Sequence, residues 1–168
     1  MKDVIECSGS TMASRSLFAL FGVLMMCTQG VALAAEYSIT KAEAPGPVLV
    51  LSNSATHLGV GFANFNVLYP DIPAGTLNDP KQLLDIRWST TYYPQTLNEK
   101  VELCYYQPFS SQKNCEEIYP NSSGVLTVFN NQSFGHGSKI TINHSVLGGT
   151  PPYARPAGVD SVTFRYRY

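Results

Sequence analysis

The sequence predicts an all-β protein built as a single antiparallel β-sandwich, and three observations predict it. Apolar and polar residues alternate without a break from Asp160 to Tyr168, as they do in a half-buried strand. Shorter runs of strand character recur along residues 48–146, separated by turn residues. All eleven prolines lie between positions 45 and 156, where they indicate loops and strand edges rather than helices. Short, evenly spaced strands with turns between them are typical of a sandwich or a small barrel.

The first 34 residues are expected to be a signal peptide that is not part of the fold. Arg15 precedes the apolar run 16–26, and Ala32-Leu33-Ala34 supplies the small residues of a cleavage site. The run is shorter than the roughly 20 apolar residues of a membrane-spanning helix. Met12 heads a better-proportioned signal than Met1, so both starts stay open. We therefore expect an exported protein, found in the periplasm and then at the cell surface or secreted, with no membrane anchor after cleavage.

The expected elements follow in chain order after an N-terminal arm and linker at residues 35–47. In the run 58–69 the phase of the apolar residues changes, and a bulge near Ala63 and Asn64 would keep both halves buried. The clearest internal alternation covers 84–92 and places Trp88 in the core. The remaining strands of the domain, residues 48–168, are expected at 48–51, 101–106, 115–119, 125–129, 140–146 and 160–168.

Two cysteines remain after the expected cleavage, Cys104 and Cys115, and both have strand-like flanks. An even pair in an oxidising compartment predicts a disulfide, which would join the two strands of a hairpin. The competing interpretation is a metal or redox pair. It is disfavoured because no histidine lies between the two cysteines and no Cys-x-x-Cys motif occurs.

Charge and motif content argue against several function classes. Residues 35–168 hold nine Lys and Arg and ten Asp and Glu, with no basic stripe, so nucleic acid is not an expected partner. The three histidines are His57, His136 and His144, and nothing in the turn around His136 supplies the partner that would hold it as a general base. His144 shares a strand face with Ile140 and Ile142, which favours a satisfied, partly buried histidine over a metal ligand. We expect no enzyme, no catalytic residue, no metal and no cofactor.

The closing segment, Gly158 to Tyr168, carries a family resemblance. Its glycine, its Asp160-Ser161-Val162-Thr163 segment and its terminal tyrosines resemble the last strand of bacterial pilus subunits of the chaperone–usher type, and of the related spore-coat U-type domains. The resemblance implies an immunoglobulin-like, pilin-like sandwich that is incomplete by itself. It implies pairing of Val162, Phe164, Tyr166 and Tyr168 with a periplasmic chaperone, and later with the arm of a neighbouring pilus subunit.

Two features depart from that family. Its usual disulfide ties the first strand, whereas Cys104 and Cys115 lie in a late hairpin. A donor arm should also carry several alternating apolar residues, and here Tyr37 and Ile39 stand before Lys41 interrupts the pattern. The second departure bears on polymerisation more than on fold.

Three hypotheses about function follow. The first is a structural or adhesive surface subunit of a bacterial fimbrium that acts by strand pairing, with a host or surface ligand as a further partner. The second is a self-contained secreted or periplasmic sandwich that binds a protein or a carbohydrate, because the ten tyrosines suit interfaces and sugar-binding faces as well as strands. The third is a small outer-membrane barrel, which the many prolines and the hairpin disulfide disfavour.

Overall fold

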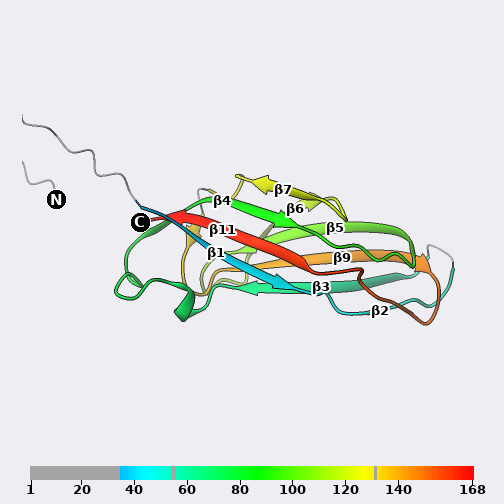
Figure 1. Cartoon of the computed structure of the whole chain (residues 1–168). Coiled ribbons are helices and arrows are strands. Elements are labelled where there is room, and N and C mark those ends of the chain that lie inside the picture. Colours follow the sequence, from blue (N-terminus) through cyan, green and yellow to red (C-terminus); the bar gives the residue numbers. More distant parts are fainter. Residues whose placement is uncertain (1–34, 54–55, 131) are drawn as a thin grey trace, which may run out of the picture. The chain divides into compact units, whose positions relative to one another are not determined.

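Two antiparallel sheets carry the long strands of the computed structural model (Figure 1). The structure describes residues 35–53, 56–130 and 132–168, so the expected signal peptide lies outside the described residues. The first sheet has the order β1 (Glu36–Glu43), β11 (Asp160–Arg167), β4 (Lys81–Ser89) and β7 (Ser123–Leu126), with β8 (Ser133–Phe134) also paired to β4. The second has the order β3 (Leu58–Asn66), β9 (Lys139–Gly149), β5 (Thr96–Tyr106) and β6 (Lys113–Ile118). The all-β prediction is confirmed.

The two sheets share one hydrophobic core, an arrangement compatible with the expected sandwich. Ile39, Ile86 and Phe164 enter it from the first sheet, and Phe65 and Ile142 enter it from the second. A smaller cluster lies beside β2 (Val48–Leu49) and β10 (Tyr153–Ala154), which pair with each other. Its members are Val48, Val50, Tyr93, Val146 and Ala154.

The closing strand β11 has the alternation that the sequence predicts. Asp160, Val162, Phe164 and Tyr166 are buried, while the residues between them are half-buried. β11 pairs with β4 on one side and with β1 on the other, so it is an inner strand. Both of its edges are therefore hydrogen-bonded, which ties the carboxyl end of the chain into the fold.

The expected bulge near Ala63 and Asn64 is wrong. β3 pairs with β9 in an unbroken register from Leu58 opposite Leu147 to Asn66 opposite Lys139. The phase of the apolar residues changes because the two halves of β3 present them to opposite sides. Ala63, Phe65 and Val67 face the core, whereas Leu58, Val60 and Phe62 are 51–62 % exposed.

A register shift occurs in β4 instead. Arg165 lies opposite Asp85 and Tyr166 lies opposite Leu83, so Leu84 is the extra residue on β4. The shift moves Leu83, rather than Leu84, into the core, where it is fully buried. Trp88 packs against the core from a partly buried position rather than within it.

The burial of Phe164 allows a direct test of the role of β11. Its ring lies 5.6 Å from that of Phe134 and is 0 % exposed. We expect Phe164→Ala to lower the free energy of unfolding by about 3–5 kcal/mol, because it leaves a cavity between the sheets. Urea denaturation measures the effect, with Val159→Ala as the matched control at a position that is 56 % exposed. Equal stability of the two variants would contradict the placement of this side chain.

Candidate strand-pairing interface

The first and last strands of the described chain lie side by side (Figure 1). β1 is antiparallel to β11 with every residue in register, from Glu36 opposite Arg167 to Glu43 opposite Asp160. Tyr37 lies opposite Tyr166 and Ile39 lies opposite Phe164. The structure thus brings together the two residue sets that the sequence singled out, the arm and the closing strand.

Aromatic stacking holds the beginning of β1 against the end of β11. The ring of Tyr37 stacks on that of Tyr168 at 4.8 Å between centroids and on that of Tyr166 at 5.8 Å. Phe134 of β8 lies 4.9 Å from Tyr166 on a tilted plane. Such aromatic pairs contribute about 0.5–1.5 kcal/mol beyond the area that they bury. Ile39 follows as the buried aliphatic residue of the arm, at 7 % exposure.

Lys41, which interrupts the apolar pattern of the arm, has a partner of its own. It follows Tyr37 and Ile39 on the inward side of β1, and its Nζ lies 2.7–2.8 Å from the carboxylate oxygens of Asp71. Asp71 belongs to the short 3-10 helix η1 (Tyr69–Asp71) and also accepts a hydrogen bond from the backbone N–H of Leu68. The third inward position of the arm is therefore held by a partly buried ion pair instead of an apolar contact.

Polar contacts on the outer side of the same strands add to the register. The hydroxyl groups of Thr40 and Thr163 lie 2.8 Å apart. Arg165 donates to Glu36 of β1 and to Asp85 of β4, at 2.7 and 2.6 Å. Ion pairs at exposed positions contribute little stability. These contacts instead specify the register of β1 against β11, because they form in only one alignment of the two strands.

The other end of β11 is fixed by a buried histidine with two carboxylates. His144 of β9 is 0 % exposed, with Nδ1 2.6 Å from Glu99 of β5 and Nε2 2.9 Å from Asp160 of β11. The second oxygen of Asp160 accepts from the N–H of Thr91, and that of Glu99 accepts from the N–H of Tyr93. Every polar atom of the cluster has a partner, and the ring presents no surface to a substrate. The cluster therefore links β5 and β9 of the second sheet to the beginning of β11 in the first sheet.

The pKa of His144 reflects this setting. Burial by itself lowers the pKa, but the hydrogen bonds and negative charges of Asp160 and Glu99 outweigh it and raise the pKa to about 9. Both ring nitrogens face carboxylate oxygens, so the imidazolium donates to both. Burial, together with the charges of Asp160 and Glu99, also raises the pKa of the nearby Tyr93 well above its ordinary value.

The pKa shift of His144 predicts a pH dependence of stability. The folded protein binds this proton more tightly than the unfolded chain, whose histidine pKa is about 6.5. The stabilisation is complete below about pH 6.5 and is lost as the pH rises through 9, an expected loss of about 3 kcal/mol. Urea denaturation between pH 6 and 9.5 measures it, with the exposed His57→Gln as the control and His144→Gln as the variant without the slope. An NMR titration of His144 in the unaltered protein with a midpoint below 7 would contradict the assignment.

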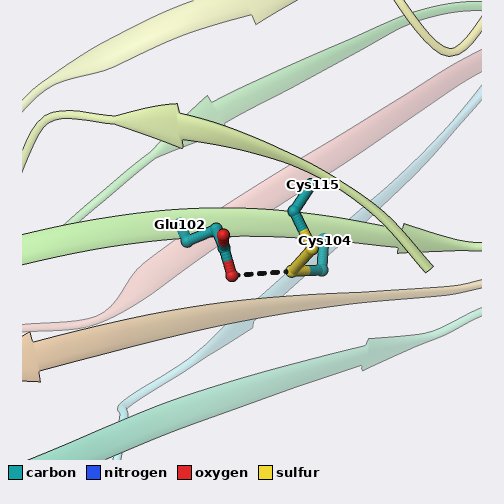
Figure 2. Close-up of side chains that lie close together, drawn as sticks. All are labelled: Glu102, Cys104 and Cys115. Carbon is teal, nitrogen blue, oxygen red and sulfur yellow. Dashed lines mark hydrogen bonds between the residues drawn. A yellow bond between two sulfur atoms is a disulfide. The ribbon is translucent and has the colours of Figure 1, made fainter.

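The disulfide forms as expected. Cys104 and Cys115 are directly opposite each other in the β5–β6 hairpin and are bonded (Figure 2). Glu102 lies on β5, the strand of Cys104, and its Oε2 is 3.2 Å from Sγ of Cys104 (Figure 2). These three side chains are close enough to suggest a metal site. Their chemistry does not fit one while the bond is intact, because zinc takes thiolates rather than disulfide sulfurs.

Removal of the disulfide gives a further prediction. The bond closes a loop with a sequence separation of 11, so the chain-entropy model assigns it about 2–3 kcal/mol. We expect the double variant Cys104→Ala, Cys115→Ala to lose that amount in urea denaturation and to become insensitive to dithiothreitol. Glu102→Gln is the control, because it changes the neighbouring charge and keeps the bond. A double variant as stable as the original would contradict a structural role.

Several contacts of the interface were missed from the sequence. The alternation of apolar residues in the arm predicted the roles of Tyr37 and Ile39. No local sequence pattern indicates that Lys41 pairs with Asp71 or that Glu36 pairs with Arg165. His144 was expected to be satisfied and partly buried; it is satisfied, and it is fully buried. Glu99 lies 45 residues away from it, and no sequence signal connects the two.

Comparisons with known proteins add no family. No family model, no curated protein and no solved structure matches the chain. Among the residues that the structure describes, no helix is long and apolar enough to cross a membrane.

Proposed function

We propose that this chain is an exported structural or adhesive subunit of a pilus-type surface assembly, which acts through pairing of its closing strand with an arm. The observation that carries the proposal is the full-register antiparallel pairing of β1 with β11. β1 occupies one edge of β11, and that edge would be free without it. A strand added at such an edge gains affinity from main-chain hydrogen bonds and specificity from alternate side chains.

The composition of β1 supports its use as an exchangeable strand. Only alternate residues of the arm face the core, and among them Ile39 is the one buried aliphatic side chain. The outward residues are polar or small, so the strand remains soluble when it is unpaired. Pro45, Gly46 and Pro47 follow β1 after Ala44 and separate the arm from the next strand. A chaperone strand or the arm of a neighbouring subunit could occupy the same edge.

A self-contained β-sandwich that binds a protein or a carbohydrate is the second candidate. The same pairing favours it in one respect, because β1 belongs to the chain whose sheet it completes. In that case the arm stays with its own domain, and the protein folds as a monomer without a partner. The two candidates differ in whether β1 can be replaced.

An arm-replacement experiment separates the candidates. In the full chain exported to a bacterial periplasm, Ile39→Asp should expel β1, because it places a charge among the buried residues. We expect the variant to associate non-specifically through the unpaired edge of β11, and a labelled peptide with the unaltered sequence of residues 36–43 to bind that edge and restore the monomer. Ser38→Asp is the matched control, since it adds the same charge at an exposed position opposite Arg165.

The outcomes are distinct. A monomeric, folded Ile39→Asp protein that binds no peptide would overturn the pilus-type proposal and favour the self-contained sandwich. If the variant does not accumulate, the unaltered protein is incubated with the labelled peptide near its melting temperature. Incorporation of the peptide would then support exchange, and its absence after refolding would count against it.

A further inference from the structure

Three loops at one end of the domain bring three ring-bearing side chains together. Tyr69 follows β3, Phe109 joins β5 to β6, and His136 precedes β9. The His136 ring lies edge-on to both others, 5.4 Å from Phe109 and 6.3 Å from Tyr69. The three residues, which we call the aromatic platform, are separated in sequence and meet through the ends of three strands.

The loops that carry the platform are held in place by hydrogen bonds. Gly137 donates its N–H to the carbonyl of Val67, and Val67 donates to the carbonyl of Ser138, both at 2.9 Å. The hydroxyl of Ser138 accepts from the N–H of Gly135. The turn at Tyr69 is fixed by Asp71, which accepts a hydrogen bond from the N–H of Leu68 and forms an ion pair with Lys41. Hydrogen-bonded loops lower the ordering cost of binding, so the Tyr69 and His136 rings are preorganised for contact.

Phe109 is the most unusual member of the platform. It has a φ of 56°, a left-handed backbone conformation that is strained for a large side chain, and it is 82 % exposed. Its ring covers Gly137, where an added Cβ would lie 2.9 Å from the ring carbons. The fold thus holds a phenyl ring in solvent through an unfavourable backbone conformation and a glycine. Core packing does not account for this placement, which leaves the ring open to contact with a ligand.

A hollow of about 360 Å³ adjoins the platform at Tyr69 and is lined by residues 69–75 and 77. This volume lies in the range of small-molecule sites. Asp71 is the one lining side chain that is charged at neutral pH, and Lys41 already neutralises it. Charge complementarity therefore favours a neutral ligand. A neutral molecule that suits exposed rings beside polar loop groups must carry both apolar faces and hydroxyl groups.

We propose that the aromatic platform and the adjoining hollow bind a neutral saccharide. The C–H face of a pyranose ring is attracted to the electron-rich face of an aromatic ring, here Phe109 or Tyr69. Sugar hydroxyls can bond to His136 and to the loop backbone. Three rings are too small a surface for a stable protein complex, which needs about 800 Å² from each partner. The three rings lie outside β1 and β11, and the ion pair of Lys41 in β1 with Asp71 connects the adjoining hollow to the paired strands.

Binding is tested with the full-length exported protein on an array of neutral and sialylated oligosaccharides. We expect retention of neutral glycans, and at least a tenfold weaker affinity for Phe109→Ala and for Tyr69→Ala in calorimetry with the best of them. Tyr119→Ala is the matched control, because Tyr119 is 76 % exposed and lies in the β6–β7 loop, away from the platform. Its affinity should stay within twofold.

An NMR titration of the unaltered protein gives a second measurement that needs no variant. Addition of the retained glycan should shift the His136 ring signals and leave those of His57 unchanged. Retention of no glycan, or of acidic glycans alone, would overturn the proposal. So would an undiminished affinity of the Phe109→Ala protein.

Discussion

The hydrogen-bonding edge of β11 is the constraint on which the rest of the structure depends. A buried strand cannot leave its N–H and C=O groups unpaired without a large loss of free energy. β4 satisfies one edge of β11, and β1 satisfies the other. The strand is also anchored at both ends, by the charged cluster at Asp160 and by the stacked tyrosines at Tyr166. The inward side chains of β11 belong to the core, and β1 of the same chain occupies its outer edge.

The two anchors differ in physical character. At the beginning of β11 a buried ion triad is fully hydrogen-bonded, so the removal of one member leaves uncompensated charge. At its end, the rings of Tyr37, Tyr166 and Tyr168 stack on one another. The structure thus attaches β11 to the second sheet through buried charges and attaches β1 to β11 through main-chain pairing and aromatic stacking.

Sequence reasoning predicted the periodic features well. The alternation at 160–168 and the hairpin disulfide follow from local rules, since strand periodicity and cysteine pairing are visible in short segments. The phase change in β3 was also visible, but its cause was misassigned. Gly59 and Gly61 face inward there, and an added Cβ would lie 2.2 Å from Val48 or 2.0 Å from the Tyr93 hydroxyl. Long-range packing, not a bulge, decides which side of that strand carries its apolar residues.

The contacts that sequence could not predict share one property: their members are far apart in the chain. Lys41 and Asp71 are separated by 30 residues, and Glu99 and His144 by 45. A charged residue at an inward position of a strand interrupts the apolar pattern, and the sequence alone does not show which residue pairs with it. The aromatic platform has the same origin, because its three rings come from loops that meet only after the sheets have formed.

The position of Glu36 directly opposite Arg167 has a consequence for engineering. A short turn could join the two ends of the folded region and convert β11 and β1 into a covalent hairpin. A circular permutant of this kind, opened in a distant loop, would keep the same neighbours around every strand. Its β1 would be tied to β11 by the chain itself, so the release of β1 would carry a smaller gain in chain entropy.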